Sequence, residues 1–179
     1  MRKKREKPRS AHASGSPELD SRIAPLAEIL RLNTVLFRNC LADLSDEQAA
    51  VRPSDGTNSA AFVAAHLASS RFFLLKTLGV EAPDPLAPYL DGRKGIDEIA
   101  QLPPLREVDA AWTTGAHLLR DRLDLLTADD IDAPSGVKFP LANGTILGTL
   151  TFLVQHDSYH LGQLSLLRKY CGLPAMRYQ

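Results

Sequence analysis

The most constraining feature of this chain is the segment 146–171, whose apolar side chains recur every three or four positions. That spacing places them on one face of an α-helix and does not fit a β-strand, in which side chains alternate. The segment therefore predicts a long amphipathic helix that must bury one face against other elements. The predicted inward face consists of Ile146, Leu150, Leu153, His156, His160, Leu164, Leu167 and Cys171.

Three earlier segments show the same helical periodicity. The first carries on one face Ile23, Ala27, Leu30, Thr34, Phe37 and Leu41. The second begins within DGTNSAAF (55–62), where Thr57 or Asn58 can cap the helix, and ends at Gly79. Its predicted inward face is Ser59, Phe62, Val63, His66, Ser69, Ser70, Phe73 and Thr77. The third spans about 105–126 and aligns Val108, Trp112, Gly115, Leu119, Leu123 and Leu126.

Two long links separate these helices. Residues 80–104 hold five prolines and cannot form one long helix, but a link of this length can run back along a bundle and join two parallel helices. Residues 127–144 form the other link, with FPLANG (139–144) as a turn or short hairpin. No convincing set of strands is present, so the sequence predicts an all-α four-helix bundle.

Length and charge indicate one domain behind a short tail. A chain of 179 residues suits a single domain, predicted over 18–179. Residues 1–17 lack periodicity and begin with MRKKREKPR, so we expect a disordered basic tail. Lys and Arg balance Asp and Glu at 21 each, which leaves the body acidic and argues against a nucleic-acid-binding core.

Neither a membrane span nor a secretory signal is expected, because no apolar run approaches the roughly 20 residues that cross a bilayer. Cys40 and Cys171 form no CxxC pair and are interpreted as reduced, half-buried thiols of a cytoplasmic protein, although one disulfide between them stays an open alternative.

His156 and His160 raise the question of function, because they interrupt an apolar helix face only about 40° apart. Burying unsatisfied imidazole nitrogens costs about 2–7 kcal/mol, whereas a histidine pair at i and i+4 can bind one divalent cation at about 2.0–2.1 Å. His66, on the inward face of the second helix, is the candidate third ligand. The alternative is a set of hydrogen-bonded core histidines. His117 is expected at the surface, and His12 lies in the tail.

The histidine within TNSAAFVAAHLA and the final HDSYHLGQLSLLRKYCGLP resemble the DinB-like (DinB/YfiT) superfamily over about residues 20–175. The resemblance implies a four-helix bundle with an up-down-down-up path, whose crossover is the link between the second and third helices. It also implies a divalent metal, such as Zn, Ni or Fe, held by His66, His156 and His160. Some relatives use a low-molecular-weight thiol, which they transfer to an electrophile or use in isomerisation.

Other polar residues of the last helix have less certain roles. Asp157 can accept a ring N–H from a ligand histidine, or it can pair with an arginine such as Arg122. Gln163 is expected to form a hydrogen bond between helices. Tyr159 points away from the inward face and is expected to contact another helix or another subunit, with proton donation a lesser alternative.

The leading functional hypothesis is a metal-dependent enzyme of the DinB-like type that acts on a small molecule. The resemblance places thiol transfer ahead of hydrolysis. The residues themselves leave both mechanisms open, because a bound cation can activate either a thiol or a water molecule. The alternatives are a non-catalytic metal-binding protein, perhaps linked to stress, and a helical interaction protein without metal. No nucleic acid or membrane partner is expected, and a homodimer is plausible.

Overall fold

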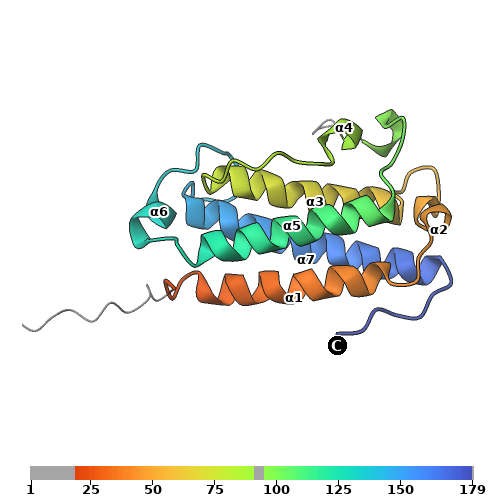
Figure 1. Cartoon of the computed structure of the whole chain (residues 1–179), viewed down its shortest axis with the longest axis horizontal. Coiled ribbons are helices and arrows are strands. Elements are labelled where there is room, and N and C mark those ends of the chain that lie inside the picture. The colour runs from red at the N-terminus through yellow and green to blue at the C-terminus, as the bar shows by residue number, and fades with distance from the viewer. Residues whose placement is uncertain (1–18, 91–94, 179) are drawn as a thin grey trace, which may run out of the picture.

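The computed structural model describes residues 19–90 and 95–178, and within these ranges it contains helices and no β-strand (Figure 1). The all-α class predicted from the sequence is therefore confirmed. The long helices are α1 (Ala24–Leu41), α3 (Ala60–Thr77), α5 (Leu105–Leu123) and α7 (Ile146–Tyr170). They lie side by side around a common core, with α3 packed on α5 and α7, and α1 packed on the same two helices.

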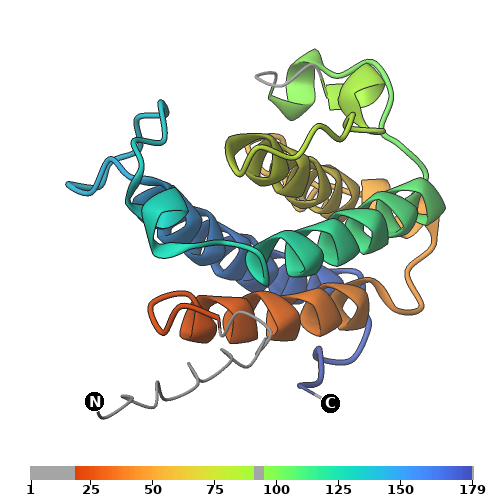
Figure 2. The same cartoon turned by 60° about the vertical axis from the view of Figure 1, so that its left-hand side comes forward.

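Short helices occupy the links and the two ends of the bundle. They are α2 (Asp46–Ala50), α4 (Ala87–Leu90), the 3-10 helix η1 (Ile96–Glu98) and α6 (Ala128–Asp132). Figures 1 and 2 show α2 and α4 at one end of the bundle and α6 at the other. The described part of the link 80–104 contains only α4 and η1, as its prolines predicted.

The ends of α3 are set by local hydrogen bonds and one glycine. Ser59 caps the helix, because its hydroxyl accepts the N–H of Phe62 at 3.2 Å. The predicted cap at Thr57 or Asn58 is therefore wrong, and the Thr57 hydroxyl instead closes a turn by donating to the carbonyl of Ser54. Gly79 adopts a φ of 79° and ends the helix where the sequence predicted.

The core follows the predicted faces of α1, α5 and α7. Its centre includes Phe37 and Trp112, which are both 0% exposed and stack with ring centroids 4.0 Å apart. The predicted inward face of α3 is wrong in part: Val63 is buried, but His66 and Ser70 are half-buried and Phe73 is 43% exposed. The helix is apolar on nearly all sides and is covered by two neighbours, so its sequence contains no single stripe.

The segment before α7 is a loop held at both ends. An isolated antiparallel bridge joins Pro134 to Thr145, and the N–H of Ser135 donates to the carbonyl of Gly144 at 3.0 Å. The predicted turn at 139–144 lies inside this loop. A Cβ on Gly148 would lie 2.1 Å from the carbonyl oxygen of Asn143, so the close approach of the loop to the first turn of α7 requires glycine.

Two further predictions concern the cysteines and the termini. Cys40 is buried and Cys171 is half-buried, and both are free thiols. The predicted basic tail, 1–17, lies outside the described residues. Among the residues that are described, no helix combines the length and the apolar character needed to cross a membrane.

Candidate metal centre

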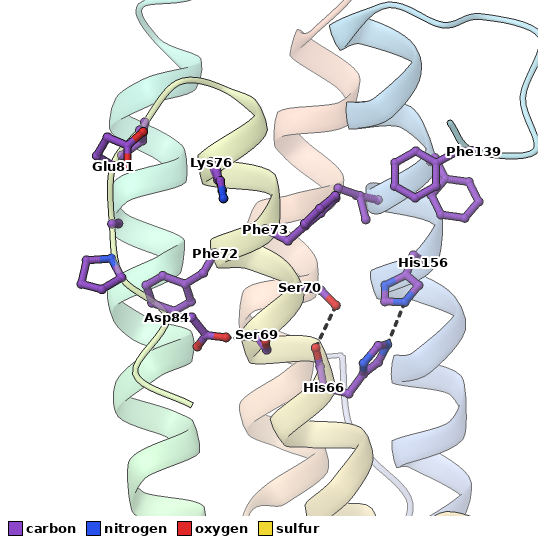
Figure 3. Close-up of a pocket in the computed structure, with 15 residues that line it drawn as sticks. His66, Ser69, Ser70, Phe72, Phe73, Lys76, Glu81, Asp84, Phe139 and His156 are labelled. Atoms are coloured by element: carbon purple, nitrogen blue, oxygen red, sulfur yellow. Dashed lines mark hydrogen bonds between the residues drawn. The ribbon is translucent and has the colours of Figure 1, made fainter. Parts of the chain in front are cut away.

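The structure brings the three predicted ligand histidines together between α3 and α7. His66 lies on α3, and His156 and His160 lie one turn apart on α7. One ring nitrogen from each can be chosen so that all three lie within 4.8 Å of one another, and the two Nε2 atoms of His66 and His156 are 3.0 Å apart. Figure 3 shows these two imidazoles pointing toward each other. His117 is exposed on α5, as predicted, and His12 lies outside the described residues.

Burial keeps these imidazoles in the neutral form that can bind a cation. It lowers the pKa of His66 to about 4, with a smaller contribution from His160. Burial also lowers the pKa of His156 to about 4, and the neighbouring histidines add to that effect. The pKa of His160 is lowered by burial and partly restored by Gln163. At neutral pH all three rings therefore present lone pairs rather than charges.

Gln163 orients the third imidazole. Nδ1 of His160 lies 2.6 Å from Oε1 of Gln163, an acceptor, so Nδ1 carries the proton and Nε2 keeps its lone pair. The Gln163 amide in turn donates to the Tyr159 hydroxyl at 3.3 Å. The predicted helix-to-helix bond of Gln163 is therefore wrong, and Tyr159 contacts its own helix. The i, i+3 spacing of His160 and Gln163 was the signal that could have revealed this contact.

The three histidines fit a divalent cation better than they fit mutual hydrogen bonding. Three nitrogens about 2.1 Å from one cation in tetrahedral geometry lie about 3.4 Å apart, so small side-chain rotations complete the set from the present spread of 4.8 Å. Hydrogen bonding between His66 and His156 satisfies only one nitrogen of each ring. Nδ1 of His156 is buried and has no partner among the described residues, which costs about 1–3 kcal/mol. Nε of Arg71, in the core, is the other buried side-chain nitrogen without a partner among the described residues, so each of the two needs its own explanation.

Asp157 does not support the histidines, although it follows His156 directly. Its carboxylate lies 3.2 Å from Nη2 of Arg71, and the two side chains are 4% and 2% exposed. The predicted bond to a ligand histidine is therefore wrong. The alternative, an ion pair with an arginine, is confirmed, but the partner is Arg71 in the core, and Arg122 instead donates to the carbonyl of Leu78. The Arg71 guanidinium also lies 3.2 Å from the centre of the Trp112 ring and donates to Thr34.

A cavity of about 710 Å³ opens beside the histidines. His66 and His156 line it together with Ser70, whose hydroxyl donates to the carbonyl of His66 at 2.8 Å (Figure 3). The cavity continues around α3 to Ser69, which donates to Asp84 at 2.5 Å. Ser69 and Ser70 belong to the predicted inward face of α3, and both line this open space instead of packing in the core.

The chain is thus an all-α bundle in which three imidazoles from two helices form a candidate cation site beside a cavity. The chain belongs to the DinB superfamily, whose family model matches residues 29–164. It is similar in structure to a DinB-like protein from Bacillus subtilis, with a TM-score of 0.57 and 14% identity over 89% of this chain and 99% of the other. This likeness concerns the fold. No curated protein matches the chain.

Proposed function

We propose that this chain is a divalent-metal-dependent enzyme that transfers a low-molecular-weight thiol to a small electrophile. One observation carries the proposal: His66, His156 and His160 present neutral ring nitrogens within 4.8 Å of one another, and the first two of them line a cavity. Three imidazoles suit Zn, Ni or Fe and leave coordination positions for other ligands. The cation supplies Lewis acidity, which lowers the pKa of a thiol or water at the site.

The surroundings of the histidines favour thiol transfer over hydrolysis. Activation of water commonly uses a carboxylate as general base, within hydrogen-bond reach of the attacking group. Among the described residues, no carboxylate forms a hydrogen bond with the three histidines, because Asp157 is turned to Arg71. A thiol has a free pKa of about 8.5, far below that of water, so it ionises at the cation more readily than water does without such a base. Phe139, Phe152 and Phe73 add apolar walls that suit a weakly hydrated thiol or thioether.

The proposal includes the up-down-down-up path and the crossover between α3 and α5. Asn33 on α1 donates to Ser158, and further along both helices Arg168 donates to the carbonyl of Cys40. This order supports a parallel arrangement of α1 and α7. For α5 and α3, Gly115 meets Arg71 and, further along both helices, Arg122 donates to the carbonyl of Leu78, which supports the same arrangement. A cytoplasmic location and a homodimer also belong to the proposal, and the free thiols agree with the former.

The test is metal content followed by turnover. Full-length protein purified without a histidine tag should contain about one divalent ion per chain by elemental analysis. It should then accelerate thioether formation between a small thiol and 1-chloro-2,4-dinitrobenzene. A chelator should abolish that rate, and the removed metal should restore it. Hydrolysis of 4-nitrophenyl acetate, measured in parallel, should be the slower activity.

Matched histidine variants separate the proposal from its alternatives. His66→Ala and His156→Ala should lose the metal and the turnover, whereas His117→Ala, at an exposed histidine of α5, should keep both. Bound metal without turnover over a broad panel of thiols and esters would leave a non-catalytic metal-binding protein. Absence of metal binding in the wild-type chain would contradict the proposal altogether.

A further inference from the structure

An aromatic wall lines the cavity next to the histidines. Phe139 and Phe152 stack with ring centroids 4.2 Å apart and an interplanar angle of 17°. Phe73 stands edge-on to Phe139, with centroids 6.3 Å apart and an angle of 84°. The three rings come from three parts of the chain: α3, the loop 135–144 and α7. Figure 3 shows Phe73 directed from α3 toward Phe139.

The wall is continuous with the histidine site. Phe152 lies one turn before His156 on α7, and their ring centroids are 6.4 Å apart. All three phenylalanines line the same cavity as His66 and His156. A small molecule whose polar group binds at the ring nitrogens would therefore place its remaining atoms against the aromatic wall.

The aromatic wall differs from the stacked pair in the core. Phe37 and Trp112 stack in nearly the same way but are 0% exposed, so their faces are fully used in packing. Phe139 and Phe152 stay only half-buried, and Phe73 is 43% exposed. Partly exposed aromatic surface gathered in a concave site is typical of ligand binding rather than of core packing.

We propose that the substrate bound at the histidine site carries a flat aryl group, which lies against Phe139 and Phe73. The edge-on and stacked geometries of the wall are those that aromatic rings prefer, so an incoming ring gains more than its apolar area alone. This inference rests on the proposed function, because the histidine site must hold the reacting end of the same molecule. Phe73, Phe139 and Phe152 are then the residues that determine specificity.

Hydroxamates that share one metal-binding group test the inference. Full-length protein loaded with Zn²⁺ is titrated calorimetrically with benzohydroxamate, cyclohexanecarbohydroxamate and acetohydroxamate. We expect benzohydroxamate to bind at least about tenfold more tightly than acetohydroxamate, because its ring is buried against the wall. It should also bind more tightly than the cyclohexyl compound, which has similar bulk but no ring face.

Variants of the aromatic wall locate the preference. Phe73→Ala and Phe139→Ala should reduce the preference for benzohydroxamate to less than about threefold and leave the affinity for acetohydroxamate unchanged. Phe139→Leu keeps an apolar side chain without a ring and should lose the preference over the cyclohexyl compound. Leu166→Ala is the matched control, because Leu166 is 68% exposed on α7 and does not line the cavity.

The outcomes separate the two proposals. Equal affinities of wild-type protein for the aryl and methyl hydroxamates would overturn the inference and leave the metal site intact. An aryl preference that survives in both Phe73→Ala and Phe139→Ala would overturn it as well. Failure of all three compounds to bind, together with failure to retain Zn²⁺, would contradict the proposed function and the inference with it.

Discussion

Two of the polar contacts between α3 and α7 lie in different surroundings, although neighbouring residues of α7 make them. The carboxylate of Asp157 meets Arg71 inside the core, where both side chains are almost fully buried. The imidazole of His156 meets His66 at the margin of the core, beside the cavity. The first contact pairs two opposite charges, whereas the second brings two identical neutral groups together. Among the described residues each contact leaves one buried nitrogen without a partner, Nε of Arg71 and Nδ1 of His156.

This difference separates a contact between opposite charges, which holds the helices, from a cluster of neutral groups for which we propose a cation. Removing one member of a buried ion pair strongly destabilises the protein, because the other charge stays unpaired in the core. Clustered neutral imidazoles gain little from each other and much from a cation. The seam between α3 and α7 therefore has a closed half, defined here as Arg71 and Asp157, and an open half, defined as His66, His156 and His160.

The largest expected effect comes from breaking the closed half. Arg71→Ala should lower the free energy of unfolding by about 3–5 kcal/mol, because it leaves the buried carboxylate of Asp157 unpaired. The loss should be larger at pH 8 than at pH 5. Burial already raises the pKa of Asp157 to about 6, and the loss of Arg71 raises that pKa further, so a protonated carboxyl relieves the variant at low pH. Urea denaturation measures both effects.

An exposed pair provides the control for this variant. Arg31 and Glu28 form an ion pair on α1 with side chains 71% and 69% exposed. Arg31→Ala should change the stability by less than about 0.5 kcal/mol. A comparable loss in the two arginine variants would contradict the assignment of the closed half as the contact that holds the helices.

Metal addition should act on the open half alone. A divalent ion at 100 to 1,000 times its dissociation constant stabilises the folded state by about 2.7–4.1 kcal/mol. The thermal melt of wild-type protein should therefore shift upward with added Zn²⁺ and return with a chelator. His156→Ala should abolish the shift, whereas His117→Ala should retain it. Equal losses of stability in His156→Ala with and without the chelator would favour hydrogen-bonded core histidines instead.

Acid should weaken the metal-free protein through the open half. The folded-state pKa values of His66 and His156 are about 4, below the value of about 6.5 in the unfolded chain. The unfolded state then binds more protons between pH 6.5 and 4, so stability falls as the pH drops through this window. We expect a fall of a few kcal/mol by urea denaturation.

The double variant His66→Gln/His156→Gln isolates this effect. Asp157 works in the opposite direction, because its raised pKa favours the folded state as the pH falls below about 6. That contribution is present in both proteins and cancels in the comparison. The double variant should lose less stability than the wild type between pH 7 and pH 5. An identical pH dependence in the two proteins would contradict the neutral, buried state of the imidazoles.

The smallest expected effect concerns the residue that orients His160. Gln163→Leu removes the acceptor at Nδ1 and should weaken metal binding by about tenfold, with little change in stability. Gln163→Glu keeps an acceptor and should retain most of the affinity. Gln155→Leu, at an exposed glutamine of the same helix, is the control. Competition titration with a metal indicator measures these affinities, and equal values for Gln163→Leu and Gln155→Leu would refute the role.

The sequence predicted the open half well and the closed half poorly. His156 and His160 share a helix face by spacing alone, and His66 is an inward histidine on another helix, so their meeting follows from packing the two faces together. Arg71 carried no comparable signal, because it lies among apolar residues of a helix without a clear stripe. A carboxylate such as Asp157 on an inward face requires a buried cation, and the sequence indicated an arginine for it but did not identify Arg71.

The aromatic wall lay beyond prediction for a different reason. Phe152 belongs to the periodic part of α7, but Phe139 lies in a loop, and periodicity says nothing about where a loop side chain will rest. Its place depends on the bridge between Pro134 and Thr145 and on the close approach at Gly148. Both are contacts between backbone segments, which a pattern of apolar residues cannot encode.

The loop 135–144 is fastened to the bundle by backbone contacts at its two ends and by the stacking of Phe139 on Phe152, with consequences for how such a chain diversifies. The side chain of Phe139 can be exchanged without removing the backbone contacts, while the histidines stay where α3 and α7 hold them. Replacing Phe139 by a polar or charged residue would therefore change the wall of the cavity at little cost to the packing of the long helices. In such a chain the bundle can stay constant while this short loop varies.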